Sequence, residues 1–450
     1  MKMNVALKRL DEQVVVITGA SSGIGLATAR LAARRGARLV LAARSGTALA
    51  QLAGEIEQAG GTASIVVADV SRQDDVRAIA RHAVDTYGGF DTWINNAGVG
   101  IYGAAASVPI EDMRNLFETN FWGVVYGSRE AVSHLRTRGG ALINLGSEVS
   151  ERSVPLQGIY SASKHAIKGF TEALRMELED EGAPVSVTLI KPGQIDTPFT
   201  VNAKNFLSSE PHHVPPVYAA DAVARAILHS AENPVRDVYV GAGARLVAGL
   251  GHVAPGLADK LMEKMVIPGT PSGRVPRRAH DANGLDTPSE QLSEQGNYEG
   301  VVQKFSLYTE ARLHPVAAGA VALGAAFLLS RLFGGGSHRP ARIVGRKGGR
   351  TPKALHVHLE ARKGREAEVE QLVQGIGELA AQEPGTRSWV ATRTGRRVFG
   401  IFGTFPNESG RRAHLSGAAA ALLRQRSNDV LARPATISRL DVIGIGTDPG

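Results

Sequence analysis

Tyr160 and Lys164 are a pair of residues whose types and spacing indicate chemistry. They are four positions apart, so a helix beginning near Tyr160 would place the phenol and the ammonium on one face. A free tyrosine phenol titrates near pH ~10, and a neighbouring cation lowers that pKa because it favours the phenolate. The pair predicts a proton donor and acceptor tuned toward neutral pH. Taken alone, such a short motif more often marks a solvated helix face than a catalytic pair.

Ser147 lies upstream of this pair, at the end of the apolar run Ala141–Leu145. Open parallel α/β sheets bind their ligands at the carboxyl ends of the strands. If the run is a strand, the Ser147 hydroxyl could hold a substrate oxygen beside Tyr160.

A glycine-rich turn, TGASSGIG, follows the β-branched run Val14–Ile17 and precedes a helical pattern that begins near Gly25. Glycines at 19, 23 and 25 would let the backbone turn tightly and approach a pyrophosphate closely. The helix N-terminus would offer unpaired N–H groups and a positive dipole end to the same group. This strand, turn and helix predict a dinucleotide site.

Arg44 follows the end of the second predicted strand, where proteins that bind NAD(H) usually place an acidic residue for the ribose 2′-hydroxyl. A guanidinium suits a 2′-phosphate instead, so we expect NADP(H) in preference to NAD(H), with NAD(H) left open and a plain surface arginine as the alternative. Strand patterns alternate with helical ones throughout this region, which predicts an α/β fold with a doubly wound parallel Rossmann sheet. The remaining strands are expected at 38–42, 64–68, 91–94, 142–145 and 185–190.

Residues 12 to about 265 resemble a short-chain dehydrogenase/reductase of the Rossmann type. Several separated motifs carry the resemblance in the expected order: TGASSGIG, Asp69-Val70, NNAG at 95–98, Asn120, Ser147, Tyr160-x-x-x-Lys164 and Pro192-Gly193. The resemblance implies an oxidoreductase that moves a hydride between a nicotinamide cofactor and a carbonyl or alcohol. It also implies an oligomer that binds a small-molecule substrate and no nucleic acid.

The resemblance assigns four catalytic residues. Tyr160 would be the general acid in reduction and the base in oxidation, Ser147 would orient the carbonyl, and Lys164 would also bind the nicotinamide ribose. Asn120 would support a water path from Lys164, its alternative being a helix cap or turn. The implied cofactor contacts are Gly19, Ser21, Ser22, Gly23, Ile24, Gly25, Arg44, Asp69, Val70, Asn96, Ala97, Gly98, Tyr160, Lys164, Pro192, Gly193, Ile195 and Thr197.

Substrate choice is expected in the loop after Pro192-Gly193, whose apolar residues would suit a ketone, aldehyde, quinone or lipid-like alcohol. The loop contains His212 and His213, which lack partners at metal-ligand spacing and are predicted to be polar loop residues. We expect no metal site in the chain.

Composition limits the number of domains and the kinds of chemistry that the chain can support. The 450 residues are 43% hydrophobic, which allows two or three folded domains, and the chain has no cysteine, so disulfides and thiol chemistry are excluded. The formal charge of +8 is concentrated between the segments that look folded, which argues against a DNA-binding face. The N-terminus lacks the apolar core of a secretory signal, and a cytoplasmic location with optional membrane association is expected.

We divide the chain into an NADP-binding domain at 1–265, a flexible extension at 266–312 and an apolar segment at 313–333. A basic linker at 334–352 and a second domain at 353–450 follow. The uncharged run 315–330 is short for a bilayer span, so it is interpreted as a membrane anchor, a docked helix or a flexible apolar tract.

The last hundred residues follow the order β-α-β-β-α-β of a ferredoxin-like α+β domain. The segments EPGTRSWV at 383–390 and FGIFGTFPNESGRRAHLSG at 399–417 resemble antibiotic-biosynthesis monooxygenase-like domains. The resemblance implies dimerisation through the sheet or cofactor-independent quinol oxygenation, with Trp389 and His414 as pocket candidates. Gly403 stands where many relatives carry an acid, which favours dimerisation. A cofactor-sensing protein is the third alternative.

Overall fold

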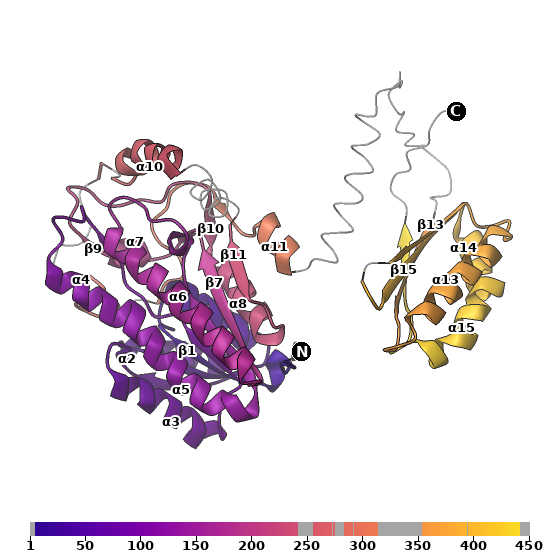
Figure 1. Cartoon of the computed structure of the whole chain (residues 1–450), viewed down its shortest axis with the longest axis horizontal. Helices are drawn as coiled ribbons and strands as arrows, with labels where there is room; N and C mark the ends of the chain where they lie inside the picture. The colour runs from indigo at the N-terminus through magenta and orange to yellow at the C-terminus, as the bar shows by residue number, and fades with distance from the viewer. Residues whose placement is uncertain are drawn as a thin grey trace. The chain divides into compact units, whose positions relative to one another are not determined.

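Two compact units make up the chain, Met1–Gly319 and Ala320–Gly450, and each is described by itself (Figure 1). The structure is a computed structural model that describes residues 5–241, 255–271, 273–274, 283–290, 292–313, 353–393 and 395–441. Apart from Leu313, the predicted apolar segment 313–333 and basic linker 334–352 lie outside these residues. Among the described residues, no helix has both the length and the apolar character that crossing a bilayer requires.

The first unit is built on a seven-stranded parallel sheet with the order β11-β7-β6-β4-β1-β2-β3. Most of these strands are continuous apolar runs, as expected where helices cover both faces of a sheet. Six of the seven were predicted from the sequence, and the seventh, β11, was not. The strands are β1 Val14–Thr18, β2 Arg38–Ala43, β3 Thr62–Val67, β4 Thr92–Asn95, β6 Gly140–Leu145, β7 Val185–Pro192 and β11 Asp237–Val240.

Helices cover both faces of this sheet. One apolar cluster joins the sheet to α1 Gly23–Arg34, α2 Gly46–Gln58 and α8 Ala220–Glu232. A second cluster joins the opposite face to α3 Gln73–Tyr87, α5 Gly123–Arg138 and α6 Gly158–Asp180. The predicted doubly wound Rossmann sheet is therefore confirmed for this unit.

The first unit also contains shorter strands and helices. A three-stranded parallel sheet, β12-β10-β8, and a parallel pair, β5-β9, lie outside the main sheet. The remaining strands are β5 Ile101–Tyr102, β8 Gln194–Asp196, β9 Lys204–Asn205, β10 Val217–Ala219 and β12 Val302–Gln303. The remaining helical elements are η1 Leu10–Glu12, α4 Ile110–Phe117, η2 Glu118–Trp122, η3 Glu148–Ser150, α7 Phe199–Asn202, α10 Pro255–Gly269 and α11 Leu307–Leu313.

The segment 266–312, expected to be a flexible extension, differs from that expectation in its described residues. Leu285 is buried in an apolar cluster of the first unit, and Thr309 Oγ1 donates a hydrogen bond to the Tyr239 carbonyl at 3.0 Å. Pro, Gly and Ser residues, which are typical of flexible linkers, also form hydrogen-bonded turns, and here such turns pack on the folded surface. Composition alone does not distinguish a flexible linker from a segment of packed turns.

The second unit contains a four-stranded antiparallel sheet with the order β14-β15-β13-β16. Helices pack against one face through a core that includes Leu359, Val369 and Phe399. The second helix of the predicted β-α-β-β-α-β order is interrupted at Gly417, which separates α14 from α15. The elements are β13 Lys353–Glu360, α13 Glu366–Ala381, β14 Ser388–Arg393, β15 Val398–Phe405, α14 Glu408–Ser416, α15 Ala418–Val430 and β16 Thr436–Asp441.

Trp389 and His414 were the predicted pocket residues of the second unit. Trp389 packs against the core, and its indole N–H is buried with no hydrogen-bond partner among the described residues. His414 pairs through Nδ1 with the Glu383 carboxylate. No group of three or more potential metal ligands occurs among the residues that the structure describes.

Candidate active site

The turn between β1 and α1 depends on glycine for its shape. Gly19 and Gly23 adopt positive φ angles of 66° and 52°, where side chains with a Cβ are strained. A Cβ on Gly19 would lie 2.8 Å from Ala97 Cα, and a Cβ on Gly25 would overlap the Gly19 carbonyl oxygen. The turn therefore brings the helix N-terminus and open backbone to one wall of a pocket, a cradle that fits the phosphates of a dinucleotide.

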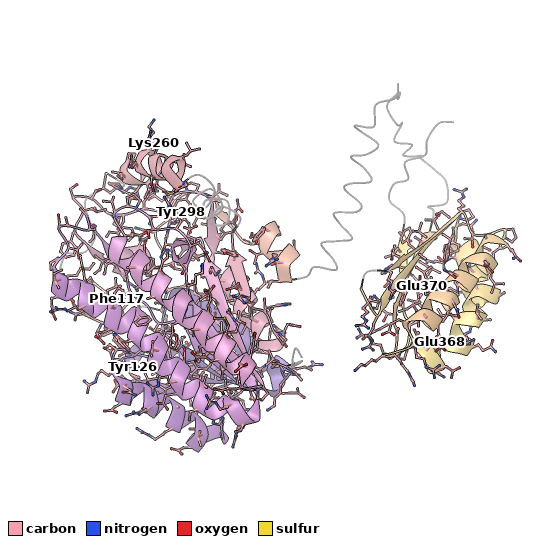
Figure 2. All side chains as sticks on the ribbon, in the orientation of Figure 1. Phe117, Tyr126, Lys260, Tyr298, Glu368 and Glu370 are labelled. Carbon is pink, nitrogen blue, oxygen red and sulfur yellow. The ribbon has the colours of Figure 1, made fainter. Side chains whose placement is uncertain are left out.

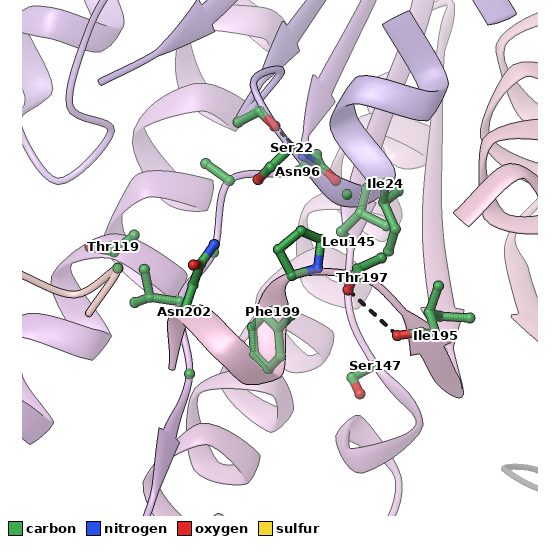
Figure 3. Close-up of a pocket in the computed structure, with 18 of the residues that line it drawn as sticks. Ser22, Ile24, Asn96, Thr119, Leu145, Ser147, Ile195, Thr197, Phe199 and Asn202 are labelled. Atoms are coloured by element: carbon green, nitrogen blue, oxygen red, sulfur yellow. Dashed lines mark hydrogen bonds between the residues drawn. The ribbon is translucent and has the colours of Figure 1, made fainter. Parts of the chain in front are cut away.

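Asn96 ties the neighbouring strand end to this turn. Its side-chain nitrogen donates to the carbonyls of Thr18 at 2.9 Å and Gly19 at 3.1 Å. The Thr18 hydroxyl in turn accepts from the backbone N–H groups of Asn96 and Ala97 at 3.1 and 3.2 Å. The NNAG segment thus fixes the glycine turn from its side, and Figure 3 shows Asn96 beside Ser22 in the pocket.

Ser147, Tyr160 and Lys164 meet at the other end of the same pocket. Ser147 follows β6 and caps the short helix η3, while Tyr160 and Lys164 lie in the first two turns of α6. Lys164 Nζ donates to the Leu145 carbonyl at 2.8 Å and lies 5.7 Å from the centre of the Tyr160 ring. The helix thus begins as predicted and places the phenol and ammonium on one side.

Burial, rather than the neighbouring cation, dominates the acidity of these groups. Burial raises the pKa of Tyr160 to about 12; a hydrogen bond with Ser147 acts in the opposite direction, and the nearby Glu148 carboxyl adds to the increase. Burial also lowers the pKa of Lys164 to about 8. The sequence argument expected a lowered Tyr160 pKa, and the protein itself does not produce one because desolvation of the phenolate outweighs the hydrogen bond with Ser147.

Asn120 lies in the π-helical turn η2 between α4 and α5 and is fully buried. Its side-chain oxygen accepts from the Val99 N–H at 2.8 Å, and its nitrogen donates to the Val99 carbonyl at 2.9 Å and to Ser163 Oγ at 3.3 Å. These bonds connect the segment after NNAG to α6, next to Lys164. They are not those of a helix cap, and the side chain does not line the pocket.

The structure brings the predicted cofactor contacts together. All of them line one continuous pocket except Gly25, which stands behind the turn. Asp69 accepts hydrogen bonds from the N–H and hydroxyl of Ser71 at 3.0 and 2.7 Å, which fixes its carboxylate at the pocket rim. In Figure 3, Thr197 bonds to the Ile195 carbonyl, and Phe199 and Asn202 project into the same space.

The sequence did not predict a cluster of three polar residues, Glu148, Gln194 and His213, at the end of the pocket that contains Tyr160. Gln194 donates to the Glu148 carboxyl at 2.7 Å, and its oxygen lies 3.0 Å from His213 Nδ1. Burial raises the pKa of Glu148 and lowers that of His213 to about 4. All three residues line the pocket, as do Tyr102 and Phe199. Only the position of Glu148, directly after Ser147, could have signalled this group.

Residues from beyond 280 also reach the pocket, which nothing in the sequence indicated. Gly284, Pro288 and Ser289 are among the residues that line it. The Arg44 guanidinium, expected at the cofactor's 2′ position, donates to the carbonyls of Gly284 and, at 3.3 Å, Leu285.

Comparison with known proteins now assigns the family. Residues 13–207 match the model of the short chain dehydrogenase family. An uncharacterised oxidoreductase of Bacillus subtilis, YxnA, is 46% identical over 327 residues, which cover 72% of this chain and 92% of that protein. The chain belongs to the short-chain dehydrogenases. It is an oxidoreductase of this family, whose members act on CH–OH groups, and the resemblance of its first domain is confirmed.

Other relatives of this dehydrogenase carry more specific names. An 11-beta-hydroxysteroid dehydrogenase A of Arachis hypogaea is 34% identical over 289 residues, 60% of this chain and 81% of that protein. A 3beta-hydroxysteroid dehydrogenase of Mediterraneibacter gnavus is 34% identical over 193 residues, 43% of this chain and 69% of that protein. A solved short-chain dehydrogenase/reductase from Burkholderia phymatum, in complex with NAD, superimposes with a TM-score of 0.51 at 26% identity. That comparison covers 61% of this chain and 99% of the solved one.

Proposed function

We propose that this dehydrogenase transfers a hydride between NADP(H) and a carbonyl or alcohol substrate, with Tyr160 as the general acid and base. The observation that carries the proposal is the single pocket that joins the glycine turn and Arg44 to Ser147, Tyr160 and Lys164. The glycine turn and Asn96 would hold the phosphates and the nicotinamide side of the cofactor. When bound, the cofactor supplies or accepts the hydride.

Tyr160 donates the proton during reduction in this mechanism. A phenol with a pKa near 12 is protonated at neutral pH, so it can donate to the carbonyl oxygen as that oxygen gains negative charge during reduction. The Ser147 hydroxyl would orient the same oxygen and stabilise its developing charge. Lys164 would lower the cost of the phenolate that remains. In alcohol oxidation each proton moves in the reverse direction.

The lining of the substrate end supports an apolar substrate with a polar group. Tyr102 and Phe199 supply aromatic surface, while Glu148, Gln194 and His213 supply hydrogen-bonding groups. The names of the hydroxysteroid dehydrogenases among the relatives fit this lining. We therefore place 3-ketosteroids beside simple ketones, aldehydes and quinones in the substrate panel.

The test is oxidation of NADPH and NADH by the full chain with this panel, repeated with Tyr160→Phe. We expect turnover with NADPH to exceed that with NADH, and the variant to lose about 10²- to 10⁴-fold in kcat while NADPH binding is retained. Tyr126→Phe is the matched control, because Tyr126 stacks on Trp122 at 6.0 Å and does not line the pocket (Figure 2). Equal rates in wild type and Tyr160→Phe would refute the role of the phenol.

For the second unit we propose a ferredoxin-like domain that dimerises through its sheet. The strand order β14-β15-β13-β16 supports the fold. The register puts Val390, Phe402 and Leu440 on the sheet face opposite the helices, where they are 52%, 39% and 40% exposed. Light scattering of the full chain, with Phe402→Ser as the variant, tests the dimer. Oxygen uptake with quinols would instead favour the alternative of quinol oxygenation.

A further inference from the structure

The strap, residues 283–290 and 292–299, forms part of the pocket although it lies outside the region that matches the family model. That match ends at residue 207. Gly284, Pro288 and Ser289 of the strap line the pocket together with the glycine turn and Arg44. The alignment with YxnA covers 72% of the chain, so it necessarily extends through the strap. The strap therefore lies within the part of the chain that aligns with YxnA.

Asn283 shapes the part of the strap that meets Arg44. Its side chain is 3% exposed, and its oxygen accepts from the backbone N–H groups of Leu285 at 2.9 Å and Asp286 at 3.0 Å. Such a turn orders the backbone from within. The Gly284 N–H donates to the Asn202 carbonyl at 2.6 Å, and the Leu285 side chain is buried beside Val99 and Ile101. The two carbonyls that Arg44 contacts thus belong to a fixed turn.

The rest of the strap is anchored around the same pocket. The Gly23 N–H, in the glycine turn, donates to the Ser293 carbonyl at 2.8 Å, and Glu294 forms an ion pair with Arg30 of α1 at 2.8 Å. Farther along, the Asp196 carboxylate accepts from the Gly296 N–H at 3.1 Å. Tyr298, labelled in Figure 2, packs edge-on against His213 with ring centres 6.0 Å apart. The strap consequently contacts α1, β8 and the substrate loop.

We propose that the Asn283 turn is a positioning element for NADP(H), whose carbonyls at 284 and 285 hold the Arg44 guanidinium in place for the cofactor's 2′-phosphate. The inference rests on the NADP(H) assignment proposed above. A guanidinium has five N–H donors, and the two carbonyls occupy two of them, so three remain for a phosphate. Because the turn restricts the side chain before the cofactor binds, less conformational entropy is lost on binding.

The experiment measures the dissociation constants of NADPH and NADH for the full chain by nicotinamide fluorescence, without substrate. Four proteins are compared: wild type, Arg44→Ala, Asn283→Ala and the double variant. Arg44→Ala should weaken NADPH binding about 10- to 100-fold, as expected for loss of a charged hydrogen bond, and leave NADH within about twofold. Asn283→Ala should weaken NADPH about 3- to 10-fold and again spare NADH. In the double variant, Asn283→Ala should add nothing.

The ratio of the two affinities distinguishes positioning from a merely structural role. Asn233→Ala, an exposed asparagine at the end of α8, is the control for loss of one asparagine and should leave both constants unchanged. NADH binding and thermal unfolding monitor the fold of each variant. If Asn283→Ala weakens both cofactors equally, weakens neither, or acts fully in the Arg44→Ala background, the positioning role is overturned. If wild type and Arg44→Ala bind NADPH alike, the NADP(H) assignment fails first, and the inference fails with it.

Discussion

Burial in the same pocket shifts the pKa values of Lys164 and Tyr160 in opposite directions. Removing water disfavours the charged form of each group, so the phenol becomes a weaker acid and the ammonium a stronger one. Near neutral pH the result is a protonated Tyr160, with a pKa near 12, beside a Lys164 whose pKa is about 8. This combination suits donation of a proton to a carbonyl, and the charge on Lys164 becomes the component that titrates within reach of physiological pH.

We therefore predict that carbonyl reduction depends on pH through Lys164. The ammonium is charged below its pKa of about 8 and supports the phenolate left by proton donation, so kcat/KM for reduction should be high at neutral pH and fall as pH rises through about 8. Alcohol oxidation, which needs the phenolate, should instead rise with pH. Initial rates in both directions from about pH 6 to about pH 10 check this. A reduction profile that is flat through pH 8 would contradict it.

At the scale of elements, the packing of α1 against the end of β1 determines whether the pocket forms. Helix, turn and the NNAG segment approach so closely that positions 19 and 25 have no room for a Cβ. Gly54 in α2 provides the contrast, because a Cβ there would meet no atom within 4 Å. Substitution by alanine should therefore have opposite effects on stability at Gly25 and at Gly54.

Gly25→Ala should destabilise the first unit by about 1–3 kcal/mol, because the new methyl group forces α1 away from the turn, and it should weaken NADPH binding. Gly54→Ala should raise the free energy of unfolding by about 0.5–1 kcal/mol, because alanine loses less backbone entropy in a helix, and leave binding unchanged. Urea unfolding and NADPH titration of both variants provide the measurement. Similar stability of Gly25→Ala and wild type would show that the turn can relax.

The same contrast explains what could be predicted from the sequence. Local patterns were sufficient for β1, the glycine turn and the start of α6, because apolar runs, glycine spacing and helical periodicity are encoded within short windows. The strap could not be predicted: the contact between Arg44 and Gly284 joins residues separated by 240 positions, and a segment rich in Pro, Gly and Asn forms either a mobile linker or a packed turn. The pKa of Tyr160 depended on enclosure, which a spacing motif does not report.

At the scale of the whole molecule, each unit has its own core. Among the residues that the structure describes, the apolar clusters of the first unit extend to residue 313, and the cluster of the second unit lies within 357–435. The described residues that line the pocket all belong to the first unit. Ligand binding stabilises only what it binds, so a cofactor in this pocket should act on one core and leave the other unchanged.

We predict two transitions in the calorimetric unfolding of the full chain, of which only one responds to cofactor. NADPH at about 100 times its dissociation constant adds about 2.7 kcal/mol to the folded first unit, which should raise that transition by roughly 5 °C. The second unit, none of whose described residues lines the pocket, should unfold at an unchanged temperature. Phe402→Ser, on the outer face of the second sheet, is the reciprocal variant and should leave the cofactor-dependent shift intact. A single transition that moves as a whole with NADPH would mean that the two cores unfold cooperatively and that the second unit contributes to the stability of the cofactor site.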